Sequence, residues 1–188
     1  MIELLKTLYF ISIIIWLFPP IRQWKNKLFS FFLILALADP VSIILSFMIK
    51  KYVYVYFTLI SYLLLISLIN YKVFLQRKYF FRIFIIVLIS LLIFIQSKIV
   101  LIVLLHFIIS LIFIKEFIVK YVFDREMNLY YIMLIFYEFT VFLKFLNILL
   151  GFSNAVAFYI ITTIFQIAFG LFFSIFREDK TRIALKRG

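Results

Sequence analysis

Long runs of apolar residues, separated by short stretches that hold most of the charged residues, repeat along the whole chain. About 20 apolar residues form an α-helix long enough to cross roughly 30 Å of hydrocarbon. The pattern therefore predicts an all-α integral membrane bundle of seven transmembrane helices, which forms a single domain over residues 1–188. The predicted spans are about 4–18, 28–49, 52–71, 80–95, 99–114, 129–150 and 155–176, followed by a basic tail, 177–188.

The residues between the runs set the expected ends of the helices. Pro19 and Pro20 are expected to end the first helix, because a proline pushes the residue before it out of the α region. Tyr and Val alternate over 52–56 with the period of a strand, but a lone strand in lipid would leave backbone groups unpaired. We therefore interpret this segment as the aromatic belt of a helix. The polar segment 115–128 is expected to extend the fifth helix into water.

The composition is that of a protein solvated by lipid. Hydrophobic residues make up 68% of the chain and the mean hydropathy is +1.23, whereas a soluble domain is about half apolar. The chain has no Cys and a single His, which excludes disulfides, thiol chemistry and metal sites built from several Cys or His side chains. We predict no catalytic residue, no cofactor and no metal site.

The distribution of positive charge predicts the orientation. The net charge is +12, and 15 of the 20 Lys and Arg residues fall in the tail and in the connections after the first, third and fifth spans. Cytoplasmic segments carry such an excess, so the N-terminus is expected outside and the C-terminus inside. Anionic lipid, rather than nucleic acid, is the expected partner of these basic segments. Frequent Ile, Phe, Lys and Tyr are typical of an AT-rich bacterial genome, and hence of a multi-pass protein of a bacterial cytoplasmic (inner) membrane.

Several polar side chains lie inside the predicted spans, where a charge costs about 2.5–3.5 kcal/mol on insertion scales. At a rise of about 1.5 Å per residue, four of them fall near the midplane of the membrane: Asp39, His106, Glu138 and Gln166. Lys144 lies roughly 9 Å nearer the outside than Glu138. The candidate partner or ligand site consists of Asp39, His106, Glu138, Lys144, Asn147 and Gln166.

Helical faces indicate which of these side chains point into the bundle. Asp39 shares a side of its helix with Ser42, and Gln166 lies on a stripe of small and polar residues, so the two helices are expected to meet there. The helix 129–150 is polar on two sides, with Lys144 on one and Glu138 on nearly the opposite one. Such a helix is either central, or one face meets a protein, a headgroup or a water-filled cavity. We expect it to contact another integral membrane protein.

Each candidate also has a structural interpretation. Asp39 can support the helix break that Pro40 creates, and Glu138 and Lys144 can neutralise charges on neighbouring helices, with Asp39–Lys144 as one candidate pair. His106 can be a hydrogen-bonded interior residue, because no nucleophile is evident near it in the sequence and a pH switch needs a partner.

Three function classes stay open. The first is a non-enzymatic sensory or assembly subunit of a larger membrane complex. The predicted topology of seven spans with the N-terminus outside fits this class, as does the expected absence of an output domain after the last span. The second is a small proton-coupled or solute transporter, although no inverted repeat is visible. The third is a lipid-modifying membrane enzyme with Asp39, His106 and Glu138 as acid–base groups. A retinal Schiff base in the seventh span is excluded, because that span contains no lysine.

Overall fold

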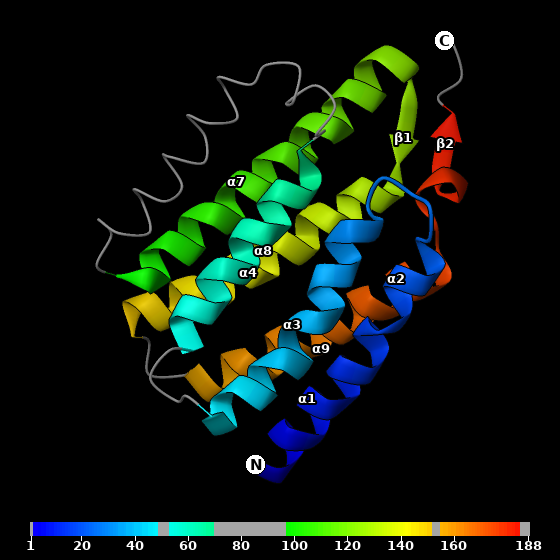
Figure 1. Ribbon diagram of the computed structural model, residues 1–188. Helices are drawn as coiled ribbons and strands as arrows, with labels where there is room; N and C mark the ends of the chain where they lie inside the picture. The colour runs from blue at the N-terminus through cyan, green and yellow to red at the C-terminus, as the bar shows by residue number, and fades with distance from the viewer. Residues whose placement is uncertain (1, 49–52, 70–96, 152–154, 185–188) are drawn as a thin grey trace.

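The computed structural model describes residues 2–48, 53–69, 97–151 and 155–184. Within these ranges nearly all of the chain is helical, with one small pair of strands near the C-terminus (Figure 1). The elements are α1 (Ile2–Trp16), α2 (Phe18–Arg22), α3 (Phe29–Met48), α4 (Val53–Leu68), α7 (Lys98–Val119), β1 (Glu126–Asn128), α8 (Leu129–Leu150), α9 (Ala155–Ile175) and β2 (Arg182–Ala184).

Four of the helical segments are long and apolar enough to cross a membrane. They are Glu3–Arg22, Lys98–Asp124, Leu129–Leu150 and Val156–Ile175, and two shorter apolar helices cover Phe29–Leu45 and Tyr54–Leu68. The prediction of an all-α chain is confirmed, and the described residues contain four candidate membrane-spanning helices rather than seven. The predicted span 80–95 lies outside the described residues.

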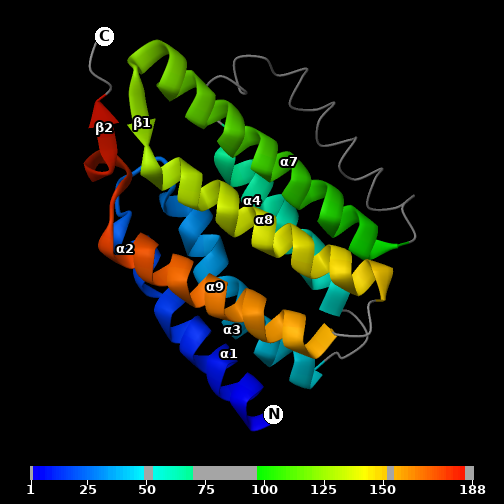
Figure 2. The same ribbon diagram turned by 180° about the vertical axis from the view of Figure 1, so that it is seen from behind.

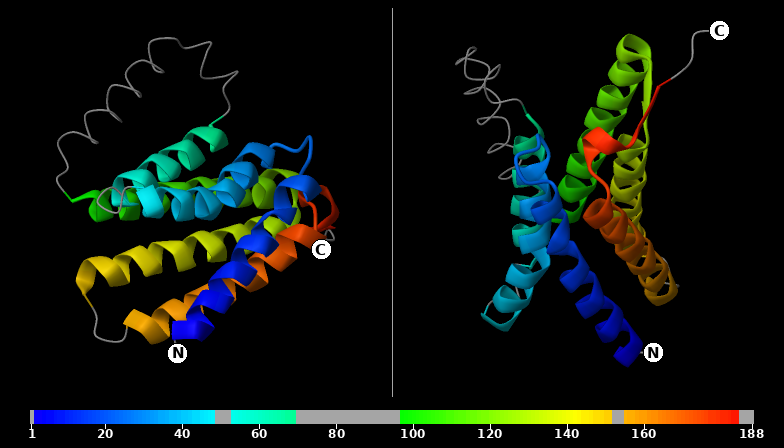
Figure 3. Two further views of the ribbon diagram at one scale, coloured as in Figure 1. Left: turned by 60° about the horizontal axis from the view of Figure 1, so that its bottom comes forward. Right: turned by 90° about the vertical axis from the view of Figure 1, so that its right-hand side faces the viewer.

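The helices are arranged as two layers that join at their edges. In one layer α3 packs between α1 and α4, and in the other α8 packs between α7 and α9 (Figures 1 and 2). The pairs α4–α7 and α1–α9 connect the layers, so the helices form a closed ring. Towards the end where the N-terminus lies, α3 diverges from α1 and α9 (Figure 3).

Aromatic side chains fill the other half of the ring. The ring of Phe173 lies 5.1 Å from those of Phe32 and Tyr130, and Trp16 lies 4.8 Å from Tyr137, measured between centroids. Lipid is as apolar as these side chains, so tight packing rather than hydrophobic burial must favour such contacts. This cluster brings α1, α3, α8 and α9 together at one end and leaves space at the other.

The prolines do not end the first helical segment as predicted. The helix is interrupted at Leu17, and a second short helix, α2, then includes both Pro19 and Pro20. A proline is tolerated in the first turn of a helix, because the backbone N–H groups there have no intrahelical acceptor. The interruption before the prolines lets a new helix start with them in that first turn.

The segment 115–128 follows the prediction only in part. Helix α7 continues to Val119 and a π-helical turn extends it to Asp124, but Arg125 then adopts a left-handed conformation with φ 52°. Strand β1 follows and pairs antiparallel with β2, with Met127 opposite Ile183. The predicted basic tail therefore contains a strand, β2, that pairs with the end of segment 115–128.

Candidate functional site

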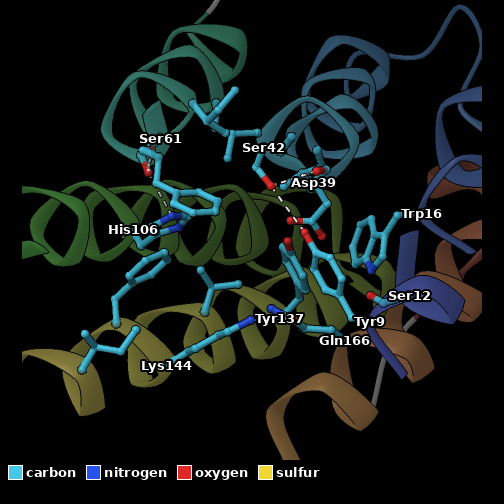
Figure 4. Close-up of a pocket in the computed structure, with 18 of the residues that line it drawn as sticks. Tyr9, Ser12, Trp16, Asp39, Ser42, Ser61, His106, Tyr137, Lys144 and Gln166 are labelled. Atoms are coloured by element: carbon cyan, nitrogen blue, oxygen red, sulfur yellow. Dashed lines mark hydrogen bonds between the residues drawn. The ribbon is translucent and has the colours of Figure 1, made fainter. Parts of the chain in front are cut away.

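A cavity of about 480 Å³ occupies the diverging half of the ring. All six helices of the ring, α1, α3, α4, α7, α8 and α9, contribute to its walls. Most of the lining is apolar or aromatic, and the charged groups are Asp39 from α3 and Lys144 from α8, which point into the same space (Figure 4). The polar faces of α3 and α9, which we expected to meet, both border this cavity, and the two helices contact each other elsewhere, where the ring of Phe32 lies 5.1 Å from that of Phe173.

Helix α3 runs through Pro40 without interruption, so the break expected beside Asp39 is not seen. Ser42 Oγ donates to the backbone oxygen of Asp39 at 2.8 Å, and Tyr56 donates from its hydroxyl to the oxygen of Ala38 at 2.6 Å. These hydroxyls add hydrogen bonds to the two carbonyls just before Pro40. Among the described residues, no side chain donates a hydrogen bond to the Asp39 carboxylate, which is left facing the cavity.

Lys144 is held from the side of α9. Its Nζ lies 3.5 Å from Gln166 Oε1 and 4.1 Å from the centroid of the Tyr159 ring. A cation over an aromatic face is attracted by the ring quadrupole. Lys144 and Asp39 interact electrostatically, but the part of the chain that the structure describes shows no direct ion pair between them. Asp39 and Lys144, the candidate ion pair of the sequence analysis, therefore both face the cavity without bonding to each other.

His106 has partners that the sequence did not reveal. Its Nε2 lies 3.2 Å from Ser61 Oγ (Figure 4). Its Nδ1 lies 2.7 Å from Glu138 Oε2. The expectation that no nucleophile type lies near His106 is wrong, because α4 places Ser61 beside it. The contacts run from Ser61 through His106 to Glu138, as they do from serine through histidine to the acid in a hydrolase triad. Which atoms carry the protons decides whether Ser61 could act as a nucleophile.

The proton positions argue against a nucleophilic Ser61. Its hydroxyl lies 2.9 Å from the backbone oxygen of Phe57 and must be the donor there, since a carbonyl only accepts. His106 Nε2 must then carry a proton and donate to Ser61, whereas a general base would accept the serine proton. One further proton is shared between His106 and Glu138, and the pair is neutral overall wherever that proton sits.

The two-sided polarity of α8 is satisfied inside the bundle. Glu138 faces α7 and is fully buried, while Lys144 faces the cavity and α9. Helix α8 thus packs between α7 and α9, with Glu138 covered by α7 and the Lys144 face bordering the cavity, while its outer side stays exposed. Glu138 Oε1 is nevertheless buried without a hydrogen-bond partner among the described residues.

The six predicted site residues fall into three groups. Asp39, Lys144 and Gln166 border the cavity with charged or amide groups. His106 lies in its wall and Glu138 lies behind His106, whereas Asn147 is buried and does not line the cavity.

The sequence missed Tyr9 and Ser61 as cavity residues. A lone serine or tyrosine in an apolar helix is too common to single out, and only the packing of the helices shows what it faces.

A second pocket, of about 520 Å³, lies at the opposite end beside α2. Three cations line it, Arg22, Lys25 and Arg177, together with Ser174 and the exposed ring of Trp24. Arg22 Nε donates to the oxygen of Ile175 at 3.0 Å, which anchors this guanidinium on the end of α9. The pocket shows that the basic connection 22–27 and the start of the tail gather in one place.

Comparison with protein-family models, with curated proteins and with solved structures finds no match for this chain.

Proposed function

We propose that this protein is a sensory or assembly subunit of a membrane complex and that it binds a small ligand in the cavity between α3, α8 and α9. The observation that carries the proposal is a pair of opposite charges, Asp39 and Lys144, that border one cavity without forming an ion pair. A charge in a membrane interior is expensive and marks a functional site by default. Two such charges kept apart favour an occupant that contacts both.

The enzyme alternative receives less support from the same geometry. Ser61 has already committed its proton to a backbone carbonyl, and His106 and Glu138 form a neutral pair with each other. Hydrogen bonds of this kind between membrane helices stabilise their packing. We therefore assign Ser61, His106 and Glu138 a structural role, as the chain of contacts that joins α4, α7 and α8.

The direction of the helices supports an odd number of spans, seven in all. Helix α4 is antiparallel to α8, because Phe57 contacts Phe145 while Ser61, through His106, reaches Glu138. Helix α7 is antiparallel to α8 as well, since His106 contacts Glu138 and Phe113 contacts Tyr131, so α4 and α7 run the same way. Leu68, at the end of α4, and Lys98, at the start of α7, therefore lie at opposite ends of the bundle. An additional span between α4 and α7, as predicted over 80–95, requires these two ends to be placed in this way.

With the N-terminus outside, the cavity occupies the middle of the membrane and extends into its outer half. Its lining comes from the middle and end of α1, the middle of α3, most of α4, the second half of α8 and the first half of α9, away from the end with β1 and β2. The basic segments at that other end face the cytoplasm by the positive-inside rule. A ligand would enter from outside, as a sensory function requires.

Two kinds of partner complete the proposal. Another integral membrane protein would contact α8 through its lipid-facing side, where Phe136 and Phe139 are exposed. An anionic lipid would place its phosphate in the basic pocket of Arg22, Lys25 and Arg177, with its chains against exposed apolar side chains of α2. Such pockets on the cytoplasmic side bind lipid headgroups by charge.

The test is purification of the tagged chain from its native membrane in mild detergent, with mass spectrometry of both the proteins and the small molecules that remain bound. We expect a stoichiometric protein partner and a bound small molecule, and Asp39→Asn should lose the small molecule but keep the protein partner. A chain with a ligand and no partner would favour a carrier over a subunit. A chain that holds neither would refute the proposal.

A further inference from the structure

We infer that the cavity ligand is a zwitterion, a molecule that carries an ammonium and a carboxylate or phosphate beside an apolar body. The inference rests on the proposed function of the cavity and names its ligand class. It follows from the hydrogen-bonding capacity that each end of the cavity has left after its internal contacts are made.

On the Asp39 side of the cavity, a carboxylate and the Tyr9 hydroxyl oxygen offer acceptors, next to the hydroxyls of Ser12 and Tyr137, which can also donate. Ser42 Oγ has one proton and donates it to the backbone oxygen of Asp39. The contact of 3.3 Å between Ser42 Oγ and the Tyr9 hydroxyl must then be made by the tyrosine proton. Both hydroxyl protons are thus committed, and the Asp39 carboxylate and the Tyr9 oxygen remain as acceptors. Such a group favours a donor with a positive charge.

The end at Lys144 offers mainly donors. The ammonium has three N–H groups, and within the described residues it reaches one acceptor, Gln166 Oε1, at the long distance of 3.5 Å. The amide nitrogen of Gln166 adds donors on the same side. The Tyr159 ring holds the ammonium from one face and supplies no strong acceptor. This end therefore favours an anion.

Most of the remaining lining is apolar or aromatic. Phe57 and Leu64 from α4, Val141 and Phe145 from α8, and Trp16 from α1 line the cavity. A fully hydrophilic ligand would leave these side chains facing polar groups. At about 480 Å³ the cavity also lies in the range of small-molecule sites, roughly 300–1,000 Å³. An apolar or aromatic amino acid fits these features, and so does a zwitterionic lipid headgroup with its chains along the walls.

The test uses the full chain in nanodiscs of phosphatidylglycerol, which has no zwitterionic headgroup. The thermal unfolding midpoint is measured with L-phenylalanine and with two analogues that each lack one charge, phenethylamine and hydrocinnamate. We expect L-phenylalanine to raise the midpoint and each analogue to bind at least about tenfold more weakly, because a charged cavity group is then left without its counterpart. A parallel sample in phosphatidylethanolamine nanodiscs tests the lipid headgroup as the source.

Two variants and a control assign the effect to the cavity. Asp39→Asn and Lys144→Met should each abolish the stabilisation. In phosphatidylglycerol nanodiscs this is the stabilisation by L-phenylalanine, and in phosphatidylethanolamine nanodiscs it is the stabilisation by the lipid itself. Lys6→Met removes a cation from the exposed start of α1 and should leave the stabilisation unchanged. A variant that fails to fold would show no cooperative transition, and the other variant then decides.

Different failures have different meanings. If one singly charged analogue stabilises as well as phenylalanine, the ligand is not a zwitterion but the cavity remains a binding site. If neither phenylalanine nor phosphatidylethanolamine stabilises the wild type beyond the two variants, the zwitterion inference is overturned. The small molecule that the native purification retains would then define the ligand class on its own.

Discussion

At the scale of single residues, the buried pair His106 and Glu138 illustrates how a membrane protein can hold ionisable groups without charge. The two side chains share one proton between atoms 2.7 Å apart, and His106 donates a hydrogen bond from Nε2 to Ser61. A neutral pair avoids most of the cost of a charge in lipid. It also joins three helices through directional contacts that apolar side chains cannot make.

We predict that removing one member of this pair is worse than removing both. His106→Leu should destabilise the protein by about 1–3 kcal/mol, because it leaves the buried Glu138 carboxyl without a partner. The double variant His106→Leu, Glu138→Leu should cost less than the sum of the single variants. Unfolding by SDS titration in mixed micelles measures each free energy. Strictly additive effects would show that the pair contributes no coupling.

Substitution of Ser61 distinguishes a structural role of this contact from a catalytic one. Ser61→Ala removes only a helix-bound hydroxyl and a neutral hydrogen bond, so we expect a loss near the mean of about 0.6 kcal/mol for such bonds in membranes. Ligand retention by the cavity should persist in the same SDS-titrated samples after refolding. Loss of a hydrolytic activity in this variant, if the wild type had one, would contradict the structural assignment.

The sequence singled out the polar residues inside the predicted spans but not their partners. Asp39, Lys144 and Gln166 were recognisable because charged and amide groups are rare in spans, and all three border the cavity. The pairing of Glu138 was not predictable, because the helical periodicity gives a face but not the neighbour that covers it. His106 supplied that neighbour, and only the packing of α7 against α8 shows it.

At the scale of elements, helices were predictable and the strand pair was not. Apolar runs of helical length give α8 and α9 their positions, because in lipid the helix satisfies its own backbone groups. Strands β1 and β2 contain three residues each and lie more than 50 positions apart. Nothing in either segment shows a strand period, so the pairing depends on the helices that bring them together.

Asn128 connects the strand pair to α8, and we predict that its loss releases the tail. Its side-chain oxygen accepts from the backbone N–H of Tyr130 at 3.0 Å and from the Thr181 hydroxyl, while its amide donates to the oxygen of Glu178. Asn128→Ala should cost about 1 kcal/mol as a lost helix cap. It should also speed tryptic cleavage within 180–182.

The rate of tail cleavage by trypsin, followed by mass spectrometry, measures this effect. Asp124→Ala is the matched control, because Asp124 is exposed and makes no hydrogen bond or ion pair among the described residues. Equal cleavage rates in the two variants would mean that Asn128 does not hold the tail.

Helices α1 and α9 approach most closely at Gly170, where we predict a steric limit. A Cβ at this position would lie 2.8 Å from Ile15 Cγ2 and 3.2 Å from Trp16 Nε1. Gly170→Ala should therefore destabilise the protein by about 1–3 kcal/mol, as overpacked sites do. Ile15→Ala in the same chain should restore part of the stability, since it removes the closest atom. SDS titration of the two single variants and the double variant measures the rescue.

At the scale of the whole molecule, the ring of helices accounts for both the apolar outer surface and the internal cavity. Large apolar residues such as Phe136, Phe139 and Ile164 point outward and are exposed, as expected for side chains in contact with lipid. Inside, the aromatic cluster around Phe173 closes one half of the ring and the charged cavity occupies the other. The sequence predicted the interior faces of α3 and α9, but not that these faces border a cavity.

The termini lie at opposite ends of the bundle (Figure 1), and this leads to a prediction about orientation. The chain has no native cysteine, so single cysteines can report which side of the membrane each end occupies. A cysteine at Glu3 should react with a membrane-impermeant thiol reagent added to intact cells, because the start of α1 is exposed and is expected outside. A cysteine at Asp124 should react only after the membrane is permeabilised. Labelling of both positions from the same side would refute an odd number of spans, and the reverse pattern would make the cavity extend into the cytoplasmic half, where a ligand from outside could not reach it.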